Sequence, residues 1–224
     1  MNMLEIRGLE KSFYGTDGSR AAHISVPSLS LDAGEMMVLE GASGSGKTTV
    51  LHLVSGLLAP DSGSVSFGGV ELTSLPRAEH DAFRARNIGY VFQKLNLFDA
   101  LTVEENVAIA AKWTGRRTEK PLERARALLA SVGLSDKAKM RPSRLSLGEQ
   151  QRVAVLRAVF NEPPLLLADE PTASLDRANA DLVLGLLKDL CAQTGAAMLL
   201  STHDEYVKAR FAKHYDMRKG GMSS

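Results

Sequence analysis

The sequence predicts an α/β fold, in which a parallel sheet carries a glycine-rich loop and a helical subdomain is inserted into the chain. Three observations predict this fold. An apolar run at 36–39 leads into a glycine-rich loop and then into a helical pattern. A second apolar run at 164–168 ends on two acidic residues, at the strand end where such sheets bind ligands. Between residues 94 and 160 the strand patterns stop and helical periodicity takes over.

Length, charge and cysteine content limit the domain organisation and the kinds of partner that the chain can have. Its 224 residues can bury one core with a small subdomain, and a net charge of +1 provides no overall field for nucleic acid or anionic lipid. The single cysteine, Cys191, fits a reducing cytosol and is expected to be a small apolar filler on a helix. Without an apolar run of about 18 residues, nothing is expected to span a membrane.

Strands are expected near 4–9 and at 28–31, before the strand at 36–39. Phe13 and Tyr14 stand just before a polar loop, where an aromatic ring can either stack on adenine or cover the edge of the sheet. Glu40 is unusual, because it places a charge at the end of a strand that should be buried on both faces.

The glycine-rich loop follows that strand, and its glycines let successive amide N–H groups point inward around an anion. The following helix adds its positive N-terminal end. Lys47 is placed to reach the β- and γ-phosphates, and the Thr48 hydroxyl to bind Mg²⁺. Alone, the loop indicates only a nucleoside triphosphate. Its residues are Gly41, Ala42, Ser43, Gly44, Ser45, Gly46, Lys47, Thr48 and Thr49.

Turn residues at 60–63 are expected to end the first helix, and a hairpin is expected at 64–70. The next strand, 88–92, ends at Gln93. The Gln93 amide can bind a metal through its oxygen and orient a water through its NH₂ group.

The helical subdomain is expected at 94–160, between core segments 1–93 and 161–220 of a single domain that covers 1–224. One helix is expected between Pro121 and Gly133. Its apolar stripe consists of Leu122, Ala125, Leu128, Leu129 and Val132. The apolar stretch 95–101 is either subdomain core or a docking surface for another protein.

Ser146 and Glu149 form a capping box before the next helix. Such a helix start also presents N–H groups that suit a phosphate, and both readings can hold together. Asp169 and Glu170 follow the strand at 164–168. There Asp169 would hold Mg²⁺ through water, and Glu170 would accept a proton from the attacking water.

Asp176 is expected to cap a helix that ends before Gly195. Leu182, Leu186 and Leu190 are expected on one face of this helix. The last strand, 196–200, leads to His203, which would lie at the same sheet edge as Glu170 and could contact a γ-phosphate.

With these motifs in this order, the chain resembles the nucleotide-binding subunit of ATP-binding cassette (ABC) transporters, from Leu4 to about Gly220. The resemblance implies a P-loop NTPase core of the RecA-like type with antiparallel hairpin elements and an inserted helical subdomain. It looks most similar to the lipoprotein-releasing, macrolide-exporter and cell-division group. The motifs are GASGSGKTT at 41–49, YVFQ ending in Gln93, LSLGEQQRVAVLRA at 145–158, LLLADEPTASLD at 165–176 and STHD around His203.

The resemblance implies the cofactors ATP and Mg²⁺ and a role for each matching position. Lys47, Gln93, Glu170 and His203 match catalytic positions, and Thr48, Gln93 and Asp169 match metal positions. Phe13 matches the adenine-stacking aromatic, with Tyr14 as the substitute. The phosphate loop 41–49, Ser146, Gly148, Glu149 and Asp176 match nucleotide-binding positions, the last four across a dimer interface.

The resemblance also implies a head-to-tail homodimer that closes on ATP and drives a separate integral membrane permease. The chain would then be cytoplasmic, at the inner face of a bacterial inner membrane, touching the membrane only through the permease and binding no nucleic acid. Leu147 stands where the family usually has glycine, and it adds a branched side chain and restricts φ. This departure keeps a regulatory or cell-division ATPase with weak turnover as an alternative, ahead of a soluble nucleic-acid-associated ATPase.

Overall fold

The computed structural model describes residues 2–115, 118–218 and 221–223, which form two compact units. Unit 1 consists of 1–84 and 197–224, and unit 2 of 85–196. The helical segment 94–160 expected from the sequence therefore lies entirely within unit 2. The predicted α/β fold is confirmed, because antiparallel and parallel strand pairs both occur together with helices.

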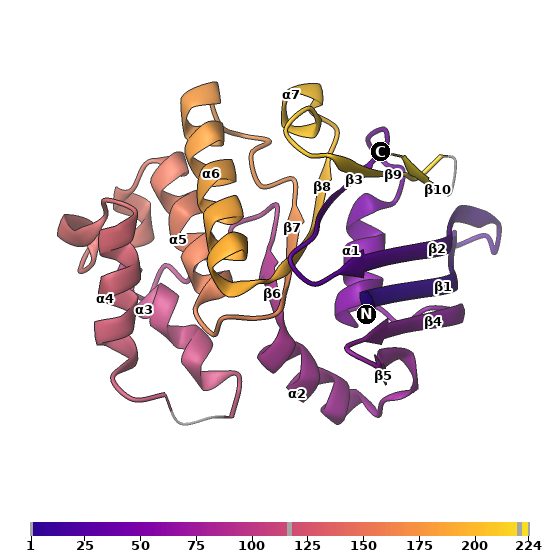
Figure 1. Ribbon diagram of the computed structural model, residues 1–224, viewed down its shortest axis with the longest axis horizontal. Coiled ribbons are helices and arrows are strands. Elements are labelled where there is room, and N and C mark those ends of the chain that lie inside the picture. The colour runs from indigo at the N-terminus through magenta and orange to yellow at the C-terminus, as the bar shows by residue number, and fades with distance from the viewer. Residues whose placement is uncertain (1, 116–117, 219–220, 224) are drawn as a thin grey trace. The chain divides into compact units, whose positions relative to one another are not determined.

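Unit 1 contains an antiparallel sheet with the strand order β2-β1-β4-β5 (Figure 1). Its strands are β1 (Asn2–Tyr14), β2 (Arg20–Asp32), β4 (Ser62–Phe67) and β5 (Val70–Glu71). The first two strands are longer than their sequence patterns suggest, because they pair with each other along most of their length.

Unit 1 also contains four strands that are hydrogen-bonded in the order β10-β9-β3-β8. These strands are β3 (Met36–Glu40), β8 (Ala197–Thr202), β9 (Lys213–Asp216) and β10 (Gly221–Ser223). Strand β3 is parallel to both of its neighbours, and Glu40 pairs with Thr202 on one side and with Asp216 on the other.

The helices of this part of the chain are α1 (Lys47–Ser55), the 3-10 helix η1 (Leu72–Ser74), α2 (Arg77–Asn87), which extends past residue 84, and α7 (Glu205–Lys208). The prediction that α1 runs to the turn at 60–63 was wrong. The helix ends at Ser55, because Gly56 adopts a left-handed conformation (φ 67°) that stops it.

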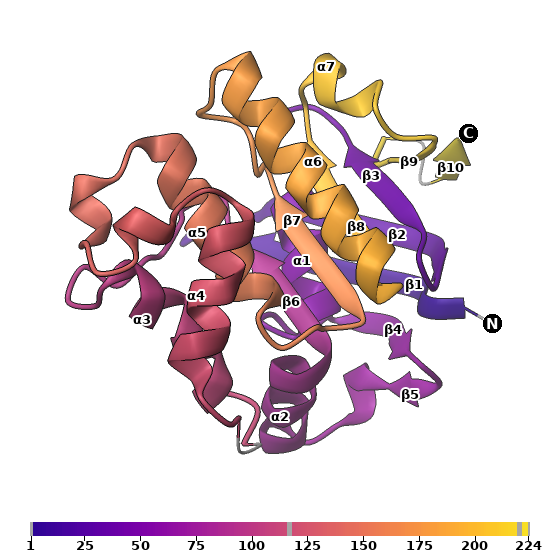
Figure 2. The ribbon, with the colours of Figure 1, turned by 60° about the vertical axis from the view of Figure 1, so that its left-hand side comes forward.

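Unit 2 begins with two parallel strands, β6 (Ile88–Val91) and β7 (Leu165–Asp169). Its helices are α3 (Val103–Ala108), η2 (Ile109–Lys112), α4 (Pro121–Ser131), η3 (Ser135–Lys137), η4 (Pro142–Arg144), α5 (Leu147–Val159) and α6 (Arg177–Thr194). Helix α5 packs against α3, α4 and α6 (Figures 1 and 2). Among the helices of the described ranges, none is both long and apolar enough to cross a bilayer.

The predicted α4 stripe is largely correct. Ala125 and Leu129 are fully buried in a cluster that α3 and α5 complete, and Leu128 and Val132 pack against it. Leu122 is 38% exposed and lies at the edge of this stripe.

The apolar stretch 95–101 is partly core and partly exposed surface, the two alternatives considered from the sequence. Leu97 packs against the helical core, whereas Phe98 is 45% exposed. The buried guanidinium of Arg157 holds the stretch by donating to the backbone oxygens of Leu95 (2.7 Å) and Asn96 (2.6 Å). Burial lowers the pKa of Arg157 to about 10.

The leucine face expected on α6 is not the buried side of the helix. Leu182 is 58% exposed, and Leu186 and Leu190 are only partly buried. The buried side is formed by Ala180, Val183, Leu184, Leu187 and Cys191. Both stripes have helical spacing, and the packing of the unit selects the second one. Gly195 ends the helix in a left-handed conformation, as predicted.

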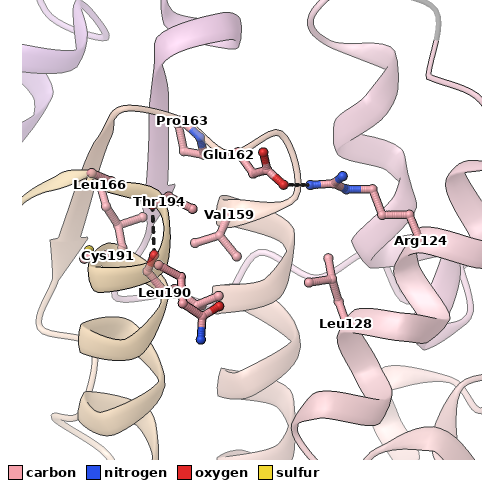
Figure 3. Close-up of a pocket in the computed structure, with 11 residues that line it drawn as sticks. Arg124, Leu128, Val159, Glu162, Pro163, Leu166, Leu190, Cys191 and Thr194 are labelled. Atoms are coloured by element: carbon pink, nitrogen blue, oxygen red, sulfur yellow. Dashed lines mark hydrogen bonds and ion pairs between the residues drawn. The ribbon is translucent and has the colours of Figure 1, made fainter.

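Cys191 is buried on α6, as predicted, and lines a small cavity of about 110 Å³ (Figure 3). Leu128, Val159 and Leu166 supply apolar walls of this cavity. Burial raises the pKa of the Cys191 thiol to about 11. The thiol is therefore an apolar packing group at neutral pH.

Candidate functional site

The phosphate loop connects β3 to α1, and its glycines are required for two reasons. Gly44 (φ 78°) and Gly46 (φ 92°) adopt the left-handed conformation. A Cβ atom on Gly46 would also lie 2.1 Å from Ile24 Cδ1, and one on Gly41 would lie 2.5 Å from Ser45 Oγ. The loop can therefore close tightly only with glycine at these positions.

Lys47 lies at the start of α1 with its side chain folded over the loop. Its Nζ donates to the backbone oxygens of Gly41 (2.8 Å) and Ala42 (3.1 Å). Ser45 Oγ is buried and finds no hydrogen-bond partner in the part of the chain that the structure describes. A buried hydroxyl of this kind needs an acceptor, and a phosphate oxygen would supply one. The loop therefore fits a phosphate group.

The start of α1 carries no negative charge of its own. Its first turn has no acidic side chain, and Gly46 provides no side-chain cap. The positive end of the helix therefore favours an anion at this point. Thr48 and Thr49 lie in this turn and are partly exposed, and Ala42 and Ser43 are exposed on the loop.

The strand register of unit 1 brings His203 to the phosphate loop. Because Glu40 pairs with Thr202, the chain enters the loop and reaches His203 at the same edge of neighbouring strands. His203 is exposed there. The register thus places His203 beside the loop, and its predicted contact with a γ-phosphate stays a prediction.

The same register distinguishes the two aromatic residues before the first loop. Lys11 pairs with Ile24, which lies against the phosphate loop, and Phe13 follows two residues later on the same face of β1. Phe13 is 37% exposed, and Tyr14, beyond a register shift, is 68% exposed. Phe13 is therefore the aromatic on the face of the strand that meets the loop.

In unit 2, Gln93 and the two acidic residues lie at one sheet edge. Val91 pairs with Ala168, so Gln93, just after β6, and Asp169, the last residue of β7, lie at the same end of neighbouring parallel strands. Asp169 is 3% exposed and Glu170 9% exposed. Glu170 has φ 44°, a strained conformation that residues other than glycine rarely adopt and that is frequent at functional sites.

Tyr90 was missed by the sequence reasoning. It stacks on Phe92 with 4.1 Å between ring centroids, and burial followed by the charge of Asp169 raises its pKa. The phenol therefore stays neutral beside the acidic pair. From the sequence, the only indication of this position was that Tyr90 and Val91 are neighbours in a strand and so point to opposite faces of the sheet.

The capping box at the start of α5 is confirmed. Ser146 Oγ accepts from the Glu149 N–H (3.3 Å), and Glu149 Oε2 accepts from the Ser146 N–H (2.8 Å). The Ser146 backbone N–H is the main reason that the pKa of Glu149 is lowered. Leu147 is the first residue of α5 and is 45% exposed. Because its conformation is helical, the φ restriction considered from the sequence has no cost here.

The start of α5 contacts the start of α6 through Asn179, a second residue that the sequence reasoning missed. A Cβ atom on Gly148 would lie 2.5 Å from Asn179 Oδ1. Asp176 caps α6, as predicted, and accepts from the Asn179 N–H and Nδ2, both at 2.9 Å. The Asn179 N–H is the first cause that lowers the pKa of Asp176.

The predicted site residues therefore form two groups. Unit 1 holds Phe13, the phosphate loop 41–49 and His203. Unit 2 holds Gln93, Asp169, Glu170, Ser146, Gly148, Glu149 and Asp176. Within unit 2 the residues lie at two places, the carboxyl end of β6 and β7 and the facing starts of α5 and α6.

Comparison with known proteins identifies the class of protein that combines these features. The profile of the family described as ABC transporter matches residues 24–173. The chain is similar over almost its entire length to ATP-binding proteins of bacterial lipoprotein-releasing systems. It is 40% identical over 224 residues to LolD 1 of Caulobacter vibrioides, covering 100% of this chain and 95% of that protein. It is 43% identical over 221 residues to LolD 2 of Rhodospirillum rubrum, covering 97% and 94%.

Solved structures agree with this result. The post-hydrolysis dimeric structure of the ATP-binding cassette MJ0796, bound to ADP and Pi, has a TM-score of 0.88 and 31% identity, covering 99% of this chain and 98% of that chain. A second dimeric structure of MJ0796, described as a bacterial ABC transporter cassette, has a TM-score of 0.85 and 32% identity, covering 96% and 94%.

The chain belongs to the ABC transporter family. More particularly, it is an ATP-binding and ATP-hydrolysing subunit of an ABC transporter, with the ABC ATPase fold that its motif order predicts.

Proposed function

We propose that this subunit supplies the energy for releasing lipoproteins from a membrane, through a separate integral membrane permease. The observation that carries the proposal is the match to named lipoprotein-releasing ATPases, which covers at least 97% of this chain in three relatives at 38–43% identity. The choice of lipoprotein as cargo would lie mainly in the permease.

The phosphate loop would hold the ATP phosphates. Lys47 would exchange its backbone contacts for the β- and γ-phosphates, and Ser45 Oγ would gain the acceptor that it lacks. Phe13 would stack on the adenine. Thr48, Asp169 and Gln93 would hold Mg²⁺, which neutralises charge on the transferred phosphoryl group.

Hydrolysis would then depend on three side chains. Glu170 would accept a proton from the water that attacks the γ-phosphorus, as the bond to the ADP oxygen breaks. Gln93 would orient that water through its amide. His203, exposed beside the loop, would contact the γ-phosphate oxygens. The products are ADP and phosphate.

A head-to-tail homodimer would complete each site. The start of α5 would close over the nucleotide held by the other subunit. Ser146 caps this helix start, and Leu147 continues it in a helical conformation. Gly148 and Glu149 shape this helix start, and Asp176 would lie at the interface. The dimeric MJ0796 structures support this arrangement.

The subunit would act in the cytoplasm, at the inner face of a bacterial inner membrane, with the permease as its only membrane contact. Exposed Phe98 is the proposed docking residue for that permease. We expect no nucleic-acid partner, since the net charge is +1.

The test is a pull-down from detergent-solubilised native membranes with ATP and Mg²⁺, using Glu170→Gln to hold the closed dimer. The matched control is the same bait without nucleotide. Mass spectrometry should find a multi-spanning protein in stoichiometric amount. That protein, reconstituted in vesicles with the unsubstituted subunit, which keeps Glu170 for hydrolysis, should release a lipoprotein only with ATP. Recovery of soluble proteins or RNA alone would refute the proposal.

One observation favours a second candidate, a regulatory or cell-division ATPase that dimerises on ATP but turns over slowly. Leu147 presents a 45% exposed branched side chain at the helix start that would face the nucleotide. In that case the complex with its membrane partner would form on ATP, but its turnover would stay very slow and no lipoprotein would be released.

A further inference from the structure

Glu40 is the last residue of β3 and directly precedes the phosphate loop. Its side chain lies near two basic residues that come much later in the chain. Lys208 Nζ is 3.6 Å and His214 Nδ1 3.7 Å from the same oxygen, Glu40 Oε2. All three residues belong to unit 1. The unusual charge of Glu40 at this strand end therefore faces Lys208 and His214.

This cluster is mostly withdrawn from solvent. The side chains of Glu40, Lys208 and His214 are 22%, 14% and 19% exposed. Partly buried charges are stable in such surroundings only when opposite charges compensate them. Burial alone would lower the pKa of Lys208, but the carboxylates of Glu205 and Glu40 outweigh it and raise the pKa. Lys208 therefore remains a cation facing Glu40.

The ring of His214 is fixed in orientation. Its Nε2 lies 2.9 Å from the backbone oxygen of Phe211, and this carbonyl can only accept. The Nε2–H group therefore donates to Phe211, and Nδ1 is directed at Glu40. His214 lies on β9, which also pairs with β3, so the cluster joins β3 to two later elements.

The segment that contains His203 is held at both ends. At one end, Thr202 Oγ1 accepts from the Asp204 N–H (3.1 Å), and the Asp204 carboxylate accepts from the Tyr206 N–H (2.9 Å). At the other end, Lys208 is the last residue of α7 and is paired with Glu40. A shift of α7 would therefore also move the exposed His203.

The other side of the cluster is the start of the phosphate loop. The backbone oxygen of Glu40 accepts from the Met217 N–H (3.0 Å), and the next oxygen, that of Gly41, accepts from Lys47 Nζ. Glu40 thus connects two places where the proposed function needs accurate geometry, the loop that holds phosphates and the histidine that contacts the γ-phosphate.

We propose that Glu40 is a positioning residue, which holds the His203 segment in a fixed place beside the phosphate loop. This inference rests on the proposed role of His203. Glu40 does not need to touch the nucleotide, and it acts through Lys208 and His214.

The test is Glu40→Gln, which keeps the side-chain size and removes the charge. We expect kcat for ATP to fall ~10-fold, less than the roughly 100-fold that a 1 Å misplacement can cost. KM and fluorescent-nucleotide affinity should change less than about twofold, because the loop itself is intact. Hydrogen exchange should become faster at the amides of 204–208 and stay unchanged in the centre of β3.

Glu205→Gln is the matched control. It removes the other carboxylate of Lys208 (2.8 Å), but Glu205 is 85% exposed and forms no ion pair or hydrogen bond with β3 in the part of the chain that the structure describes. Turnover and exchange should match wild type. Lys208→Met should resemble Glu40→Gln, and the double variant should lose less than the product of the two single losses.

Wild-type kcat together with wild-type exchange at 204–208 in Glu40→Gln would overturn the inference. Equal effects of Glu40→Gln and Glu205→Gln would also overturn it. If exchange at 204–208 rises but kcat does not change, the anchor exists without a positioning role, and the inference again fails. Failure of the lipoprotein proposal appears separately, in the cargo-release assay and not in these measurements.

Discussion

Gly148, the second residue of α5, allows a sharp test of how the starts of α5 and α6 meet. A glycine-to-alanine change within a helix normally stabilises a protein by about 0.5–1 kcal/mol. At Gly148 the added Cβ would lie 2.5 Å from Asn179 Oδ1 and 2.7 Å from its Cγ, both closer than atoms can pack. We therefore expect Gly148→Ala to be destabilising.

The magnitude follows from how Asn179 is held. Its amide cannot swing away freely, because its Nδ2 and its backbone N–H both donate to Asp176 at 2.9 Å. Forcing an extra methyl group into a packed contact costs roughly 1–3 kcal/mol, and losing one hydrogen bond costs about 0.5–1.5 kcal/mol. After subtracting the helix gain, we expect a loss of about 0.5–4 kcal/mol in the free energy of unfolding.

Urea unfolding monitored by circular dichroism measures this loss. Gly185→Ala is the matched control, because Gly185 lies within α6 with no atom within 4 Å of an added Cβ. It should stabilise by about 0.5–1 kcal/mol. Adding Asn179→Ala to Gly148→Ala should restore part of the loss. If Gly148→Ala proves as stable as Gly185→Ala, the proposed contact between the two helix starts is refuted.

Three further predictions concern single side chains. Leu147→Gly removes the exposed branched side chain at the start of α5 and should raise steady-state ATPase turnover by at least about twofold; unchanged or lower turnover would contradict this account. Burial raises the pKa of the Cys191 thiol to about 11, so the thiol stays protonated at pH 8. A thiol reagent should therefore label it fully only in urea, and rapid labelling of the native protein would contradict its burial. Leu187→Ala on the buried side of α6 should cost about 2–5 kcal/mol in urea unfolding. Leu182→Ala on its exposed side should change stability by less than about 0.5 kcal/mol, and equal costs would show that the buried face is misassigned.

Features that depend on nearby residues were predictable from the sequence. Ser146 and Asp176 cap their helices and Gly195 ends α6, because each acts on backbone groups within a few positions. The phosphate loop was predictable for the same reason, since its glycines and Lys47 are consecutive.

Features that depend on packing were not predictable. Helix α2 (Arg77–Asn87) has no buried residue and so no apolar stripe that could reveal it. On α6, the leucines at 182, 186 and 190 have the same spacing as a buried face, and only the neighbouring helices select the other side. The partners of Glu40 lie far along the chain, so its charge could be noticed but not explained.

The measurement that most directly tests the account is ATP-dependent cross-linking between two different copies of the chain. One copy carries Ser43→Cys in the exposed phosphate loop, the other carries Leu147→Cys at the start of α5, and both carry Glu170→Gln. Buried Cys191 stays in place.

After mixing and mild oxidation, we expect a covalent dimer of twice the 24.1 kDa chain mass only when both copies and ATP with Mg²⁺ are present. Each variant alone should give no such product. A dimer that forms equally well without ATP, or no dimer at all, would contradict a head-to-tail dimer in which one copy closes over the ATP held by the other.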